Sequence, residues 1–425
     1  MLANKGNLIA GIALCSTLVR VISGPIVLLV LSNKFSSEEL SIYFVFFSLA
    51  AVRQLIESGA GSVLKQRLAY YYIRNNTKLG LVKLSSFVNF TLFYFFVLAT
   101  IYFLILFFFG THFIQSKGIN IDWKTPWLLF CIISFLSTLI VPLLIFLDSF
   151  QKQEKLQKFQ LFSSFTYTIV LIVSIILDFG LYSIVISLLI SNSILFLFSI
   201  KELWCQIKII KIKKSFFSNT KKCFLDVKGF IFKAFLSFIS IFSFWNLIPL
   251  SCFYFTPTEF SAKFNLTWAL LKSGFYMAQV LNLSQVTIYT KLSLEPKSCF
   301  VRFSQVFIVC MLFLIFGYMV FIAIKFFEVS LFSGTMTGDF LYVLILVCIF
   351  YSPFVLISDF SRCFNNEFFS HDVFYASISC FVIFSIGFYC QSNDYFVFSI
   401  AVLLFFLFLM WNKYKRWRNA ILIAS

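Results

Sequence analysis

Four cations lie inside long apolar stretches of this sequence, where a charge is costly to keep. They are Arg20, Arg53, Lys233 and Lys272. A charged side chain at membrane depth faces the interior of a helix bundle or a water-filled cavity, and by default it marks a substrate or ion pathway. Guanidinium groups bind phosphate oxygens through a planar fork, and ammonium groups bind them as point charges. These residues therefore indicate the binding of an anion within the membrane.

The neighbours of Arg20 and Lys272 at helical spacing are small, polar or aromatic. Arg20 shares its face with Ser16 and Ser23, whereas the opposite face is aliphatic. The face of Lys272 carries four such neighbours: Asn265, Trp268, Tyr276 and Gln279. Neither cation has an acidic partner on its own helix, which favours substrate binding over a structural ion pair. The aromatic rings beside Lys272 would also stack against sugar rings.

Arg53 has a carboxylate one helical turn away, so two interpretations stay open. It shares a face with Gln54, Glu57 and Gly61. An ion pair with Glu57 would be structural, because intramembrane charges commonly pair. The alternative is substrate binding, since Gly61 on the same face would let a bulky headgroup approach the backbone. Lys233 lies near a predicted cytoplasmic helix end, where its ammonium would reach the headgroups.

Twelve apolar stretches are long enough to hold these side chains on membrane-spanning helices. Of 425 residues, 60% are hydrophobic and 12% are charged, which excludes a soluble globular domain. About 20 apolar residues cross the hydrocarbon core. The predicted spans are 8–32, 40–62, 84–109, 126–148, 160–177, 181–200, 230–254, 263–289, 301–326, 340–359, 372–390 and 395–411. We therefore predict an all-α polytopic membrane protein whose first span is retained rather than cleaved.

Lysine and arginine are divided very unevenly between the loops. Most of the 34 lie at the N-terminus, in the even-numbered loops and in the C-terminal tail. The odd-numbered loops hold only five: Lys34, Lys117, Lys124, Lys263 and Lys325. The positive-inside rule therefore places both termini in the cytoplasm. The net charge of +17 follows from this bias, so membrane lipids are expected partners and nucleic acid is not.

A basic loop at 201–228 divides the spans into six and six. The sequence thus predicts an N-terminal six-helix bundle at 1–200, this cytoplasmic linker, a C-terminal six-helix bundle at 229–412, and a basic cytoplasmic tail at 413–425. Both halves begin in the cytoplasm, so the repeats are parallel and related by an axis along the membrane normal. Two bundles facing a central cavity are typical of an alternating-access transporter.

A faint internal repeat supports this division. Pro142 stands six residues before Asp148 at the end of the fourth span, and Pro353 stands six before Asp359 at the end of the tenth. Chance is the alternative, since Pro and Asp are common at helix ends. The two aspartates are predicted to anchor helix ends at the membrane interface, beside Lys152 and Arg362. Three prolines are candidate hinges: Pro25, Pro142 and Pro353.

Other function classes lack their sequence signatures. There is no P-loop, and the longest odd-numbered loop, at about 110–125, is too short for the extracytoplasmic domain of a membrane polymerase. The 11 cysteines are scattered without CxxC or metal-ligand spacing, so we expect no metal site and no cofactor. A membrane-embedded enzyme would need paired carboxylates or a catalytic histidine. The two histidines, His112 and His371, fall in predicted loops on opposite membrane faces.

Two features resemble the MOP superfamily of multidrug, oligosaccharidyl-lipid and polysaccharide exporters. One is the set of twelve spans in two halves with a basic central loop. The other is the second span, which reads Tyr43-Phe-Val-Phe-Phe-Ser-Leu-Ala and then Leu55-Ile-Glu-Ser-Gly59-Ala-Gly61-Ser before a basic loop. Within the superfamily the chain is most similar, over essentially its whole length, to the Wzx type, the flippases of O-antigen and capsule repeat units.

The resemblance implies a MATE-like fold and translocation of undecaprenyl-pyrophosphate-linked oligosaccharide across the bacterial inner (plasma) membrane. Flippases of this superfamily carry cavity-facing cations in spans one, two and eight, where Arg20, Arg53 and Lys272 stand here. These three would bind the pyrophosphate while the prenyl tail stays in lipid and the halves rock between inward-open and outward-open states. An O-antigen polymerase and chain-length machinery are further implied partners. Whether H⁺ or Na⁺ drives transport is open.

The alternative is a MATE-like cation-coupled exporter of drugs or other small molecules. Such an exporter would need acidic cavity residues to hold cationic cargo and to exchange it for protons or sodium. Buried acids are few in this sequence, and Glu57 has Arg53 one turn away. The sequence therefore ranks the flippase first, this exporter second and an enzyme last.

Overall fold

The computed structural model describes residues 23–424 with short gaps. The gaps are 58–59, 74–77, 210–222, 226–234, 237, 284, 286–287, 290–291, 293–294, 328–331, 333 and 365–367. Arg20, Lys233 and much of the first predicted span lie outside the described residues, and the side chain of Gln54 is likewise not described.

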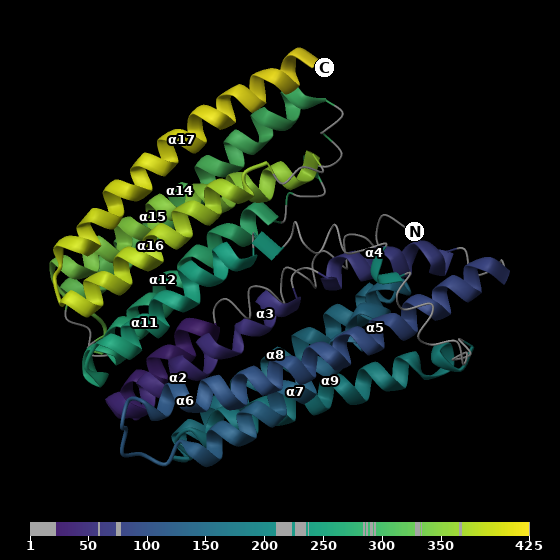
Figure 1. Ribbon diagram of the computed structural model, residues 1–425, viewed down its shortest axis with the longest axis horizontal. Coiled ribbons are helices and arrows are strands. Elements are labelled where there is room, and N and C mark those ends of the chain that lie inside the picture. The colour runs from purple at the N-terminus through teal and green to yellow at the C-terminus, as the bar shows by residue number, and fades with distance from the viewer. Residues whose placement is uncertain are drawn as a thin grey trace. The chain divides into compact units, whose positions relative to one another are not determined.

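Every regular element within these ranges is a helix, and ten helices are long and apolar enough to cross a membrane (Figure 1). In the first half these are α2 (Ser37–Ala50) with α3 (Val52–Glu57), α5 (Lys78–Ile105) with η1 (Leu106–Gly110) and α6 (Thr111–Gln115), α7 (Lys124–Ser149), α8 (Gln153–Ile176) and α9 (Tyr182–Ile209). In the second half they are η2 (Ser243–Leu247) with α11 (Ile248–Phe255), α14 (Pro296–Phe326), α15 (Asp339–Ser361) with η4 (Arg362–Phe364), α16 (Ser370–Cys390) and α17 (Asp394–Ala424).

Further helical segments include residues 23–34 at the start of the described chain, α4 and α12. The short α4 (Ala60–Ile73) follows α3, and α12 (Thr258–Leu283) has 26 residues but a more polar composition than the other long helices. α12 overlaps the predicted eighth span, and each predicted span from the second onward overlaps a helix. The prediction of an all-α polytopic membrane protein is therefore confirmed.

The predicted loop positions of the two histidines are wrong. His112 lies in α6, and His371 lies in the first turn of α16. The helices continue past their apolar cores into more polar sequence, and such extensions satisfy backbone hydrogen bonds without adding to the hydrophobic signal.

The described chain divides into two compact units. Unit 1 comprises the described residues of 1–30 and 49–238, and unit 2 comprises those of 31–48 and 239–425. Unit 2 therefore includes α2 as far as Ser48, although the sequence placed this segment with the N-terminal bundle. The Ser41 hydroxyl donates to that of Ser261 on α12 at 3.2 Å, a buried contact that ties α2 into unit 2.

Unit 1 is built around α5, α7, α8 and α9, which pack side by side (Figure 1). Its core contains Phe87, Phe90 and Phe146, together with aliphatic residues such as Leu68 and Leu98. Aromatic pairs such as Phe146 and Phe150, whose ring centroids lie 5.9 Å apart, tie the core together. The buried faces of these helices thus hold unit 1 together, whereas their outer faces are apolar and exposed, as lipid contact requires.

Unit 2 has a strongly aromatic core, formed by side chains of α12, α14, α15, α16 and α17. Phe244 of η2 stacks on Tyr351 of α15 with centroids 3.5 Å apart, and Phe303 of α14 stacks on Phe360 of α15 at 3.9 Å. These rings fix the helices that carry the predicted site residues. α12 begins after an extended Thr256 (φ −112°, ψ 161°), a conformation that the following Pro257 favours.

Gly110, at the end of η1, permits a close contact with Trp127 of α7. A Cβ atom at position 110 would overlap the Trp127 ring, which is 2% exposed and donates through Nε1 to Thr111 Oγ1 at 3.1 Å. Gly110→Ala should therefore lower the free energy of unfolding by about 1–3 kcal/mol, the usual range for overpacking. Thermal unfolding of purified protein measures this effect.

The matched control is Gly317→Ala in α14, where a Cβ atom would meet nothing within 4 Å. Equal melting temperatures for the two variants would contradict the overpacking argument.

Candidate functional site

Lys272 lies on α12 in unit 2, and its recorded partners are neutral. Its Nζ donates to Asn246 Oδ1 at 3.1 Å and lies 5.8 Å from the ring centroid of Tyr276. No carboxylate oxygen among the described residues lies within ion-pair distance of it. The side chain of Lys272 is half-buried, and the described residues place no counter-ion beside it. Such a cation retains donors for an anionic ligand.

Asn246 was not singled out in the sequence, because a single amide in an apolar stretch carries little signal. It lies in η2, a short π-helical segment at the start of α11, and is 6% exposed. A π-bulge shifts the register of the residues that follow it and often occurs at functional sites. Here the bulged segment presents Asn246 to Lys272, so this asparagine is an additional residue of the candidate site.

Two tryptophans flank this pair. Trp245 and Trp268 are each 1% exposed, and their ring centroids lie 5.5 Å apart. Within the described chain, neither buried indole N–H has a hydrogen-bond partner. An unsatisfied buried donor costs about 1–3 kcal/mol. Trp268 packs on Phe244, Phe264 and Phe384 in this conformation, so it would reach a sugar only if these helices separate.

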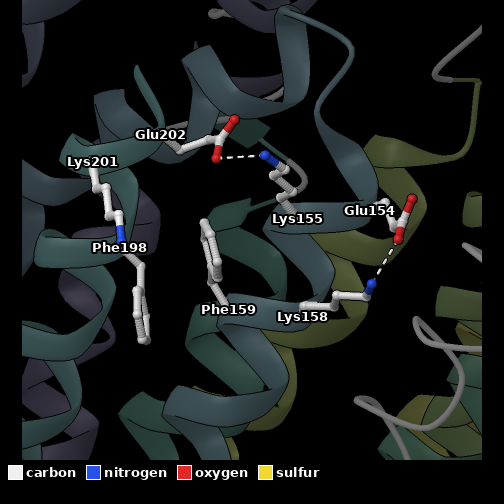
Figure 2. A pocket seen from close by; sticks show the side chains of 7 residues that line it. All are labelled: Glu154, Lys155, Lys158, Phe159, Phe198, Lys201 and Glu202. Carbon is white, nitrogen blue, oxygen red and sulfur yellow. Dashed lines mark hydrogen bonds and ion pairs between the residues drawn. The ribbon is translucent and has the colours of Figure 1, made fainter. Parts of the chain in front are cut away.

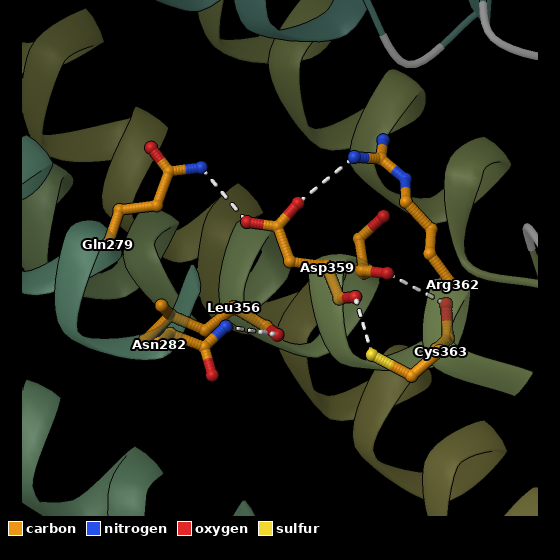
Figure 3. Close-up of polar contacts among 8 residues, drawn as sticks. Gln279, Asn282, Leu356, Asp359, Arg362 and Cys363 are labelled. Carbon is orange, nitrogen blue, oxygen red and sulfur yellow. Dashed lines mark hydrogen bonds and ion pairs between the residues drawn. The ribbon is translucent and has the colours of Figure 1, made fainter. Parts of the chain in front are cut away.

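Gln279, two turns beyond Lys272 on α12, binds a buried carboxylate (Figure 3). Its Nε2 donates to Asp359 Oδ2 at 2.9 Å, while Arg362 donates to Asp359 Oδ1 at 3.0 Å. Asp359 is 5% exposed and lies near the end of α15. Close by, Asn282 Nδ2 donates to the Leu356 carbonyl at 3.4 Å. Both contacts join the ends of α12 and α15.

Unit 1 contains a related arrangement at the end of α7. Asp148 pairs with Lys65 of α4, and the Ser149 hydroxyl donates to the Lys65 carbonyl at 3.1 Å. The partner of Asp148 is thus Lys65, whereas Lys152 pairs with Glu202 at 2.7 Å. In both units, then, the helix carrying the Pro–Asp pattern is tied by its aspartate to a neighbouring element, and Pro142 and Pro353 lie inside those helices.

Glu57 and Arg53 lie on α3, also in unit 1. Glu57 turns toward Gly61, where its Oε1 lies 2.7 Å from the position that a Cβ atom would occupy. The sequence suggested that a headgroup could approach the backbone at Gly61. In the structure the Glu57 carboxylate fills that space instead. Arg53 acts on Glu57 electrostatically, but the described contacts include no ion pair between them within 4.0 Å.

The structure thus brings Lys272, Tyr276 and Trp268 together and links Gln279 to Asp359. Pro25 is half-buried in a helical segment at the start of the described chain. A common cavity lined by Arg20, Arg53 and Lys272 stays a prediction.

Comparison with known proteins shows similarity in fold alone. No protein-family model matches the sequence, and no curated protein matches it by sequence. Among solved structures, the chain is similar to an inward-facing multidrug-resistance MATE family transporter of the MOP superfamily, with a TM-score of 0.64 and 11% identity over 98% of this chain and 99% of that one.

A second similar structure is the lipid II flippase MurJ in an inward closed conformation. Its TM-score is 0.58 and its identity is 16%, over 92% of this chain and 86% of that one. Both neighbours are membrane transporters rather than enzymes. The fold of this chain therefore resembles that of these two transporters, and at these identities the comparisons do not specify what it carries.

Proposed function

We propose that this protein is a flippase for undecaprenyl-pyrophosphate-linked oligosaccharide of the O-antigen or capsule repeat-unit class. It acts in the bacterial inner membrane by alternating access, with both termini in the cytoplasm. The observation that carries this proposal is the uncompensated cation Lys272, held by Asn246 and Tyr276 within a transporter fold. A buried positive charge with neutral partners binds an anion and repels a cation.

Two aspartates at helix ends already have basic partners. Asp359 is already bound by Arg362 and Gln279, and Asp148 is paired with Lys65. A drug exporter that exchanges cationic cargo for protons or sodium needs a carboxylate that is free to change partners. These two carboxylates have basic partners, whereas Glu57 has no ion pair within 4.0 Å among the described contacts. The preference for an anionic substrate therefore rests on Lys272, which has no acidic partner among the described residues.

The fold supports movement of a lipid-linked anion. The lipid II flippase has the same fold over most of both chains. In our mechanism Lys272 and Arg53 bind the pyrophosphate, Arg20 adds a third cation, and the prenyl chain stays in the bilayer. Rocking of the two bundles then exposes the headgroup on the other side. The glycan is positioned by polar and aromatic side chains such as Tyr276.

The test uses purified protein in lipid vesicles with a fluorescent undecaprenyl-pyrophosphate oligosaccharide in both leaflets. A membrane-impermeant quencher reports the fraction that becomes accessible from outside. We expect accessibility to rise from about half toward complete only in vesicles with protein, because each leaflet initially holds about half of the lipid. Transport of cationic dyes without any change in the labelled lipid would instead support the small-molecule exporter.

A further inference from the structure

A basic pocket lies between α8 and α9 in unit 1 (Figure 2). Its volume is about 360 Å³. Seven residues line it: Glu154, Lys155, Lys158, Phe159, Phe198, Lys201 and Glu202. The pocket is at the start of α8 and toward the end of α9, the ends that the loop charges place on the cytoplasmic side.

The pocket carries a net positive charge despite its internal ion pairs. Lys155 pairs with Glu202 at 2.6 Å, and Lys158 pairs with Glu154 at 2.6 Å. Lys152 adds a second cation on Glu202 at 2.7 Å. Lys201 is exposed and has no ion pair with any described carboxylate. Lysines therefore outnumber acids around the pocket, and Lys155 and Lys158 each keep donors for a phosphate oxygen.

Apolar side chains line part of the pocket and continue from it along the exposed face of α8. Phe159 and Phe198 stack with ring centroids 5.2 Å apart between the lysines. Along the same helix, exposed apolar side chains continue at helical spacing: Phe162, Phe165, Ile169 and Val173. From Phe162 to Val173 the helix rises about 16 Å, close to the depth of one leaflet of a bilayer core about 30 Å thick.

We propose that this pocket binds an anionic phospholipid of the cytoplasmic leaflet. The headgroup phosphate would lie among Lys155, Lys158 and Lys201, and an acyl chain would follow the exposed face of α8. A basic pocket at the cytoplasmic end of two membrane helices matches the charge and depth of such a headgroup. A lipid bound there would contact residues of unit 1 alone.

The test measures lipid binding to purified protein by native mass spectrometry with phosphatidylglycerol, cardiolipin and phosphatidylcholine. We expect both anionic lipids to bind more tightly than phosphatidylcholine. Lys155→Ala with Lys201→Ala should weaken phosphatidylglycerol binding about 25-fold, at about fivefold per lysine. Glu154→Gln removes a competing carboxylate from Lys158 and should strengthen binding, so the test does not rest on a loss that misfolding could mimic.

The matched control is Lys297→Ala with Lys415→Ala, which removes the same charge from exposed lysines of α14 and α17. We expect less than about a twofold loss there, because screened charges outside the pocket contribute little. An equal loss in both double variants would overturn the proposal. So would displacement of the lipid by millimolar inorganic phosphate, or preferential displacement by a polyprenyl pyrophosphate, which would assign the pocket to free phosphate or to the transport substrate.

Discussion

Lys272→Ala should abolish transport of the lipid-linked oligosaccharide while protein abundance stays near wild type. The ammonium has neutral partners in Asn246 and Tyr276, so its removal leaves no buried charge uncompensated. Folding therefore loses little. Transport loses a charge-assisted contact with the pyrophosphate worth about 1.5–3 kcal/mol, which corresponds to about 10- to 150-fold in affinity.

Lys272→Arg should be milder, because the positive charge survives although the shape of the group changes. Vesicle transport and complementation of surface polysaccharide are the two measurements, each normalised to membrane abundance. Lys263→Ala is the matched control, since Lys263 is on the same helix and only pairs with Glu259 one turn away, at 2.8 Å. If Lys272→Ala transports as well as Lys263→Ala, the cationic site is wrong.

The sequence predicted the helices well because length and apolar composition suffice for that purpose. A stretch of about 20 apolar residues has few alternatives to a membrane helix. Even α12, which is relatively polar, overlaps the span predicted at 263–289 from the length of its apolar stretch. The partners of these residues were harder to predict, since they depend on contacts between distant segments.

Two residues illustrate what a single sequence leaves out. Asn246 accepts a hydrogen bond from Lys272 and lies in η2, which is π-helical. A one-residue change of helical register cannot be predicted from the amino-acid composition of the segment. Asp148 was expected beside Lys152, its neighbour in sequence, yet it pairs with Lys65 of α4. Sequence proximity is a poor guide here, because the turn after α7 allows Lys152 to reach Glu202 on α9 instead.

Arg53→Ala should also lose transport while remaining folded, and Glu57→Gln should change little. The sequence left open a structural ion pair between these residues, in which removal of either partner would harm folding. In the structure the Glu57 carboxylate lies against Gly61, and the described contacts include no direct pair with Arg53. Arg53 is also close enough to influence Tyr102 of α5, whose hydroxyl donates to the Ala50 carbonyl at 3.0 Å.

Any coupling between the two residues should therefore be weak. Abundance of Arg53→Ala, of Glu57→Gln and of the double variant should all be near wild type, with Arg67→Ala on α4 as the control for loss of a cation. Transport by the double variant should equal that of Arg53→Ala alone, because Glu57→Gln by itself is expected to change little and the described contacts include no ion pair between the two residues. A closed pair would give the opposite pattern, in which the single variants are depleted from the membrane and the double variant is restored. Arg53 would then be structural, and pyrophosphate binding would be left to Lys272 and Arg20.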